Sequence, residues 1–166
     1  VLLVKHMNET PKLGILGLGV FLPEEVRKND WWPQETVENW VRQAAQHPPP
    51  GPPADDSEAE VLRVLSKLAG DPLRGATERR IMSPGMEVAD MEIAAGKAAL
   101  ARADVDPSEI DLVLVYSTVP DYLTTNAACT VHAALGLPTS CFSLSVEAGC
   151  NAFQQQLSLA QSMLTA

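Results

Sequence analysis

From residue 87 onward, helical and strand patterns alternate along the chain, and this alternation constrains the fold more than any other feature. Segments 87–105, 124–137 and 150–166 have the amphipathic, alanine-rich pattern of helices. Two short apolar runs, 112–116 and 139–146, lie between them and have the composition of β-strands. Helices that connect successive strands leave those strands parallel, with helices on both faces of the sheet. The sequence therefore predicts an α/β fold with a mostly parallel sheet.

The beginning of the chain is expected to add one more strand. Segment 12–23 alternates apolar residues with glycine, which predicts a buried strand that leads into a loop. Residues 1–11 are interpreted as a tag or disordered start, with Met7 as the natural first residue. The folded region is accordingly expected to be 12–166.

An insertion with a helix of its own is expected at 44–70. A helix is predicted over 29–46, beginning after a proline. Five of the six residues 48–53 are proline, which is typical of a stiff or disordered surface segment. A second helix is then predicted over 57–70, with Ser57 as its N-cap.

Charge and composition exclude several classes of protein. The net charge is −9, from 12 basic and 21 acidic residues, which argues against nucleic-acid binding. No apolar run of 18 residues is present, so no membrane span is expected. Three cysteines without an export signal indicate reduced thiols in the cytoplasm. The cysteines and three scattered histidines lack the spacing of a zinc site, so no metal is expected.

Cys150 is the candidate nucleophile, because it stands where the strand over 139–146 gives way to a helix. A thiol at the start of a helix lies near unpaired backbone N–H groups, which favour the nucleophilic thiolate. Its small neighbours, Ala148 and Gly149, leave room for a substrate carbonyl, and its own N–H could donate to an oxyanion. The alternative is that Cys150 is a small buried apolar residue. For Cys129 and Cys141 a core position is expected.

A partner for the thiolate is not evident within the chain. Acyl chemistry on a cysteine needs a histidine or a hydrogen-bond donor within reach. His132 is expected in the middle of a helix as a packing or surface residue, and His47 stands beside the prolines.

Four stretches, in this order and spacing, resemble the N-terminal half of the β-ketoacyl-acyl-carrier-protein synthase III family. They read GLGVFLPEEVRKND, GATERRIM, DMEIAAGKAALARADVDPSEIDLVLVYSTVPDYLTTNAACTVHAALGL and GCNAF. The resemblance covers nearly all of 12–166 except the insertion. It implies a thiolase-like fold, of which this chain would be the N-terminal βαβαβαββ half of a five-layered α-β-α-β-α sandwich.

The resemblance also implies a chemistry. An acyl group would pass from coenzyme A or an acyl carrier protein to Cys150, and a malonyl-type nucleophile would then take it in a decarboxylating Claisen condensation. Such reactions belong to fatty-acid, polyketide and secondary-metabolite biosynthesis. Trp40 would stack on the adenine of coenzyme A. Arg74 lies one position after the expected coenzyme-contacting arginine, whose aligned place is taken by Leu73. No tightly bound cofactor is implied.

Partners are implied as well. The family's catalytic histidine and asparagine would come from a C-terminal half, and the complete fold is expected to be a homodimer. Arg74, Arg79 and Arg80 form a basic cluster that could meet phosphate or an acidic carrier protein; ordinary surface ion pairing is the alternative.

Several positions depart from the family pattern. Ser145 stands in place of aspartate, Glu147 in place of a small residue and Ala152 in place of glycine. Thr124 and Thr125 replace residues that are often aromatic and proline, which suggests a wider or more polar acyl pocket. Two other functions therefore stay open: an acyltransferase that delivers the acyl group to a hydroxyl or amine, and a non-catalytic subunit or carrier-docking module.

Overall fold

The computed structural model describes residues 1–4, 14–46, 51–68, 71–124 and 126–164. The chain divides into two units, each of which is described by itself. Val1–Pro23 and Met82–Ala166 form the sheet unit, and Glu24–Ile81 form the ribbon unit.

The sheet unit is built on three strands in the order β1-β4-β5: Leu2–Val4, Leu112–Val115 and Phe142–Ser145. Strands β4 and β5 are parallel, with Val115 opposite Ser145, as the alternation of strands and helices predicts. Strand β1 is antiparallel to β4, which the sequence analysis did not expect.

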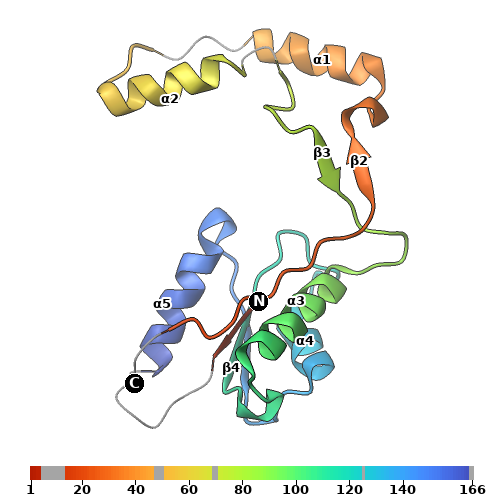
Figure 1. Cartoon of the computed structure of the whole chain (residues 1–166), viewed down its shortest axis with the longest axis vertical. Helices are drawn as coiled ribbons and strands as arrows, with labels where there is room; N and C mark the ends of the chain where they lie inside the picture. Colours follow the sequence, from red (N-terminus) through yellow and green to blue (C-terminus); the bar gives the residue numbers. More distant parts are fainter. Residues whose placement is uncertain (5–13, 47–50, 69–70, 125, 165–166) are drawn as a thin grey trace. The chain divides into compact units, whose positions relative to one another are not determined.

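Helices cover both faces of this sheet, so the unit has three layers (Figure 1). Helices α3 (Val88–Ala103) and α4 (Ala127–Leu135) lie on one face, and α5 (Ala152–Leu164) lies on the other. A single 3₁₀ turn, η2 (Pro107–Glu109), precedes β4. Helix α4 ends at Gly136, whose φ of 68° lies in the left-handed region that glycine tolerates best.

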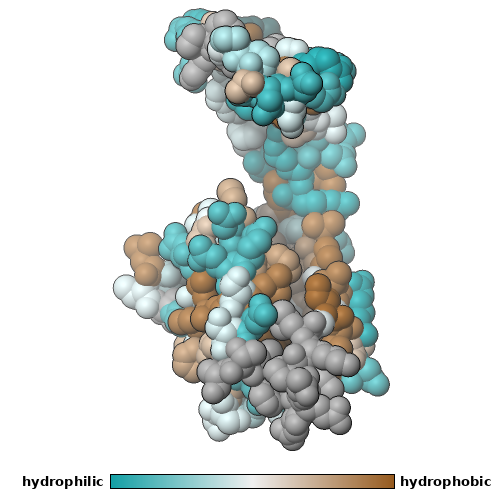
Figure 2. Space-filling view, turned by 90° about the vertical axis from the view of Figure 1, so that its left-hand side faces the viewer, coloured by the Kyte–Doolittle hydropathy of each residue, from teal (hydrophilic) through white to brown (hydrophobic). Residues whose placement is uncertain are grey.

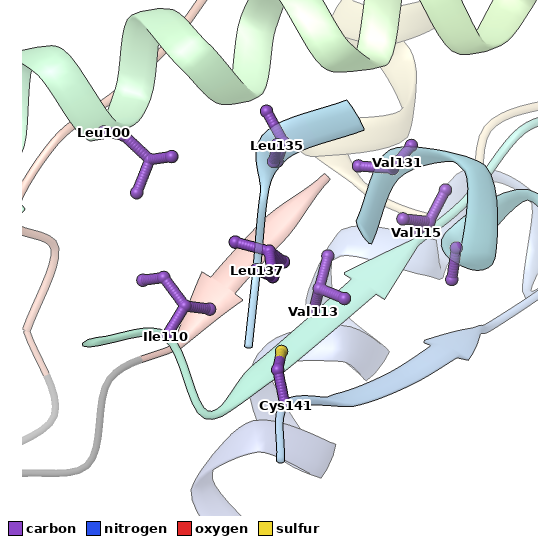
Figure 3. Packing of buried hydrophobic residues seen from close by; sticks show 9 residues of the cluster. Leu100, Ile110, Val113, Val115, Val131, Leu135, Leu137 and Cys141 are labelled. Atoms are coloured by element: carbon purple, nitrogen blue, oxygen red, sulfur yellow. The ribbon is translucent and has the colours of Figure 1, made fainter. Parts of the chain in front are cut away.

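Alternate side chains of β4 supply the two halves of the core. Val113 and Val115 point towards α3 and α4, where they meet residues such as Leu100 and Val131 (Figure 3). Leu112 and Leu114 belong to a second cluster that includes Ala160 of α5. Successive residues of a strand point to opposite faces, so a strand covered on both sides is apolar throughout. All four residues of β4 are buried.

The predicted strand over 12–23 is wrong for its described part, because residues 14–23 contain no strand. The place beside β4 is occupied by β1, which also shows that the expected disordered start contains a strand at Leu2–Val4. Segment 14–23 instead runs against α3: a Cβ on Gly19 would lie 1.8 Å from the carbonyl oxygen of Ala95. Its large apolar side chains are 61–66% exposed, at Ile15, Leu16, Leu18, Val20 and Leu22. The face of the molecule shown in Figure 2 has hydrophobic residues, drawn in brown, among the hydrophilic ones.

The ribbon unit holds a two-stranded antiparallel ribbon and two α-helices. Strands β2 (Val26–Lys28) and β3 (Glu78–Arg80) pair with each other, and a 3₁₀ turn, η1 (Asn29–Trp31), follows β2. Helices α1 (Gln34–Ala45) and α2 (Asp56–Ser66) confirm the two predicted helices.

The predicted N-cap of α2 is wrong. Asp55, not Ser57, caps the helix, because its carboxylate accepts a hydrogen bond from the N–H of Glu58 at 2.8 Å. Residues 51–53 of the proline-rich stretch have no helix or strand, and 47–50 lie outside the described residues.

Candidate functional site

Cys150 lies on an exposed turn between β5 and α5. It is the middle residue of a 3₁₀ turn, η3 (Gly149–Asn151), which leads directly into α5. The turn is closed by a hydrogen bond of 3.2 Å from the N–H of Asn151 to the carbonyl oxygen of Ala148. Gly149 has a φ of 54°, a backbone conformation that residues other than glycine rarely adopt. The predicted strand–turn–helix setting of Cys150 is therefore confirmed, and its side chain is accessible.

The other two cysteines lie in different environments. Cys141 is buried in the cluster between the sheet and α4, as expected, although it immediately precedes β5 rather than lying within it. Burial raises the pKa of its thiol, and nearby Asp111 adds to the effect. The core position expected for Cys129 is wrong. Its side chain is exposed, because the buried stripe of α4 consists of Ala128, Val131 and Leu135.

The strand end that precedes Cys150 is joined to α4 by side-chain hydrogen bonds. The hydroxyl of Ser145 donates to Oδ1 of Asn126, the N-cap of α4. The same Oδ1 accepts the N–H of Ala128 at 2.9 Å, and that N–H lies 3.3 Å from the Ser145 hydroxyl. From the sequence, Ser145 was noted only as a departure from the family pattern. Asn126 was not predicted as a functional residue, although an asparagine just before an apolar helical run is a capping signal.

A base for Cys150 is not found among the predicted histidines. Nε2 of His132 lies 2.9 Å from the carbonyl oxygen of Pro138, a contact that ties α4 to the loop after it. His47 lies outside the described residues. Within the described ranges, no group of three or more histidine, cysteine or acidic side chains is placed to hold a metal ion. None of the described helices is long and apolar enough to cross a bilayer.

Trp40, the predicted adenine contact, belongs to a row of tryptophans in the ribbon unit. It is half-buried on α1, and its ring meets Trp32 edge-on with 5.0 Å between centroids. Trp32 meets Trp31 in the same way at 4.7 Å, and the guanidinium of Arg27 lies 3.6 Å from the Trp31 ring centroid. Trp40 is therefore held by packing against aromatic rings rather than standing free on the helix.

Arg74, the predicted coenzyme contact, is exposed in a turn of the ribbon unit. Its own φ is 49°, in the left-handed region. The carboxylate of Asp71 organises this turn by accepting N–H groups from Gly75 at 2.6 Å and Leu73 at 2.8 Å. These bonds lower the pKa of Asp71, with the Gly75 N–H as the main cause. Cys150 belongs to the sheet unit, whereas Trp40 and Arg74 belong to the ribbon unit.

The three clustered arginines do not share one surface. Arg79 and Arg80 are consecutive in β3, so their side chains point to opposite faces of the ribbon. Arg79 donates to Oδ1 of Asn29 at 2.9 Å, and Arg80 donates to the carbonyl oxygen of Glu24 at 3.1 Å. A shallow hollow of about 290 Å³ lies on this ribbon. Its lining carries charges of both signs, from Glu25, Arg27, Lys28 and Asp30, together with Val26 and Trp31.

Comparisons with known proteins connect this arrangement to one family. No family model matches the chain. The β-ketoacyl-[acyl-carrier-protein] synthase III of Roseiflexus castenholzii is 40% identical over 90 residues, which are 54% of this chain and 27% of that protein. The enzyme of the same name from Bacillus pumilus is 30% identical over 146 residues, which are 87% of this chain and 37% of that protein.

A solved structure agrees with these relatives. The crystal structure of 3-oxoacyl-[acyl-carrier-protein] synthase III from Aquifex aeolicus matches with a TM-score of 0.61 and 25% identity. The match covers 91% of this chain and 40% of that one, so the chain spans well under half the length of the relatives it matches. Over the part that it spans, the chain has the thiolase-like fold and is similar in sequence and structure to proteins named β-ketoacyl-[acyl-carrier-protein] synthase III.

Proposed function

We propose that the chain supplies the acyl-accepting cysteine of a ketosynthase III-like enzyme, and that Cys150 is this nucleophile. The observation that carries the proposal is the accessible thiol on the turn between β5 and α5. In open α/β sheets, ligands bind beyond the carboxyl ends of the parallel strands. The turn that carries Cys150 follows the carboxyl end of β5 and therefore lies in this region. The relatives named β-ketoacyl-[acyl-carrier-protein] synthase III give the chemistry its class.

The first step is acyl transfer to the cysteine. Sγ of Cys150 attacks the carbonyl carbon of an acyl thioester, and a new sulfur–carbon bond forms. The bond from that carbon to the sulfur of coenzyme A or a carrier-protein phosphopantetheine breaks. The departing thiolate takes up the proton that the Cys150 thiol has released. Ala148 and Gly149 flank the thiol with little bulk, so a carbonyl can approach it.

The second step is the condensation. A malonyl-type thioester loses carbon dioxide, and the resulting carbanion attacks the acyl carbon on Cys150. A carbon–carbon bond forms, the sulfur–carbon bond to Cys150 breaks, and the released Cys150 thiolate takes a proton from water. We assign the histidine and asparagine of this step to a part of the family fold that the chain does not span, because neither the exposed turn nor His132 offers a base.

The ribbon unit is proposed to bind the carrier of the acyl group. Trp40 contributes a ring fixed by Trp32, which suits stacking on an adenine. Arg74 presents an exposed cation in a turn held by Asp71, which suits a phosphate. The same proposal includes two partners: a second copy of the complete fold, which forms a homodimer, and an acyl carrier protein.

The proposal is tested by assaying the full-length protein with an acyl-coenzyme A and a malonyl-carrier protein. Carbon dioxide and a β-ketoacyl product are expected, and Cys150→Ala should abolish both. Cys129→Ala is the matched control, because it removes another exposed thiol, from α4, and should leave the rate unchanged. If the protein instead delivers the acyl group to an alcohol or amine without releasing carbon dioxide, its function is that of an acyltransferase and not of a condensing enzyme. Product formation by Cys150→Ala would overturn the assignment.

A further inference from the structure

Two loops follow the parallel strands β4 and β5, and both begin at the same edge of the sheet. The backbone holds the strand ends together, since the N–H of Val146 donates to the carbonyl oxygen of Val115 at 2.9 Å. The loop after β4 leads to α4, and four residues separate the end of β5 from Cys150. The position of the Cys150 turn therefore depends on how firmly the end of β5 is held.

The loop after β4 provides a fixed support. Asp121, within this loop, accepts the N–H groups of Val88 at 2.7 Å and Ala89 at 2.9 Å, which attaches the loop to the first turn of α3. Further along, Asn126 caps α4 through the N–H of Ala128. Charge-assisted bonds to helix N-terminal N–H groups are among the stronger hydrogen bonds at a protein surface.

Ser145 connects the end of β5 to this support. Leu144 and Val146 pack on the α5 side of the sheet, so the alternation of the strand turns Ser145 towards α4. There its hydroxyl donates to Oδ1 of Asn126 and lies within 3.3 Å of the Ala128 N–H. We propose that Ser145 is a positioning residue for Cys150: its bond to the cap of α4 fixes the end of β5 and thereby the orientation of the thiol.

This inference rests on the proposed function, because it assumes that Cys150 reacts with a bound acyl thioester. A thiol that reacts within a bound complex needs a defined orientation, whereas its reaction with a small reagent from solution does not. Loss of the Ser145 hydroxyl should therefore slow acylation at saturating acyl-coenzyme A. The rate of alkylation by iodoacetamide and the acyl-coenzyme A concentration that gives half-saturation should both stay close to those of the parent protein.

The experiment compares four forms of the full-length protein: the parent, Ser145→Ala, Ser145→Thr and Ser143→Ala. Single-turnover mass spectrometry gives the acylation rate of Cys150, and iodoacetamide gives its intrinsic reactivity. Ser145→Ala should acylate about tenfold more slowly, the size expected for losing one ordinary hydrogen bond. Ser145→Thr keeps the hydroxyl and should restore the rate. Ser143→Ala is the matched control, because Ser143 lies two residues earlier on the same face of β5.

The outcomes separate the inference from the proposed function. Acylation of Ser145→Ala at the parent rate would overturn the positioning role while leaving Cys150 as the nucleophile. An equal loss of acylation and alkylation, or no rescue by Ser145→Thr, would show a general disturbance of the turn and would also overturn it. A parent protein that forms no acyl adduct on Cys150 would overturn the proposed function and the inference together.

Discussion

The sheet unit and the ribbon unit differ in what holds them together. Strand β4 of the sheet unit is buried on both faces, and Val113, Leu114 and Val115 are each 0% exposed. Among the described residues of Glu24–Ile81, by contrast, not one is buried. The ribbon unit is instead held by its strand ladder, the row of tryptophans and the Asp71 turn. Hydrophobic burial is the main term that offsets chain entropy, so the sheet unit has the larger intrinsic stability.

This difference matters for the proposed chemistry. Cys150 follows a strand of the sheet unit, whereas Trp40 and Arg74 belong to the ribbon unit. Elements with few buried apolar contacts open locally at the lowest free-energy cost. The proposed nucleophile thus belongs to the unit with the buried core, and the proposed carrier contacts belong to the unit that has no buried residue among those described.

The largest expected effect is on the core of the sheet unit. Leu114→Ala should lower the free energy of unfolding by about 2–5 kcal/mol, because it removes a fully buried side chain between the sheet and α5. The matched change in the ribbon unit is Leu65→Ala, since Leu65 is 47% exposed on α2, and it should cost less than about 1 kcal/mol. Urea unfolding of both variants checks this comparison. Equal losses would mean that the ribbon unit buries its apolar residues after all.

A second change tests whether segment 14–23 belongs to the sheet unit. Gly19→Ala places a methyl group 1.8 Å from the Ala95 carbonyl oxygen, so the segment must move away from α3, at a cost of about 1–3 kcal/mol. Gly14→Ala is the control, because no atom of the described residues lies within 4 Å of its added methyl group. Hydrogen exchange of α3 and urea unfolding measure the difference. Identical behaviour of the two variants would contradict the close approach of this segment to α3.

Two carboxyl groups give the units opposite responses to pH. Burial raises the pKa of Glu92 in the sheet unit to about 7, with Asp121 adding to the rise. Both oxygens of Glu92 are buried, and among the described residues neither has a hydrogen-bond partner. Because its pKa exceeds the ordinary value of 4.5, its contribution to stability is present below pH 4.5 and is lost as pH rises through about 7.

Glu92→Gln should remove this loss, which is on the order of 1–2 kcal/mol after solvent screening. Thermal unfolding at pH 5 and pH 8 measures the difference between variant and parent. Asp71 of the ribbon unit behaves in the opposite way. Its pKa is lowered from 3.8, so its contribution is present above that value and is lost as pH falls. A parent protein whose stability rises between pH 5 and pH 8 by as much as that of Glu92→Gln would contradict the burial of Glu92.

The smallest expected effect concerns the cap of α2. Asp55→Ala removes the side chain that accepts the Glu58 N–H and should cost about 1 kcal/mol of helix stability. Ser57→Ala should have almost no effect, because Ser57 lies inside the helix. Circular dichroism of the helical signal during urea unfolding distinguishes the two. A larger loss of stability in Ser57→Ala than in Asp55→Ala would show that Ser57, as expected from the sequence, is the N-cap of α2.

The periodic elements of the sheet unit were predictable, because burial on a sheet leaves a direct pattern in the sequence. The apolar run that forms β4 and the helical segment that contains α4 were both expected and both observed. The environment of Cys150 was also predictable, since a strand pattern stops and a helical pattern begins around it.

The contacts that depend on tertiary placement were not predictable. Segment 14–23 has a strand pattern, yet β1 takes the place beside β4, and no local propensity decides between two competing segments. The exposure of Cys129 depends on which stripe of α4 meets the sheet. The bond from Ser145 to Asn126 joins residues 19 positions apart, and only the parallel pairing of β4 and β5 brings them together.

The central claim is that Cys150, and neither of the other two cysteines, carries an acyl group as a thioester. The most direct test is peptide mapping by mass spectrometry of the full-length protein after brief incubation with an acyl-coenzyme A. We expect an acyl adduct on the peptide that contains Cys150, its removal by neutral hydroxylamine, and unmodified peptides for Cys129 and Cys141. An adduct on Cys129, or three unmodified cysteines, would contradict the account.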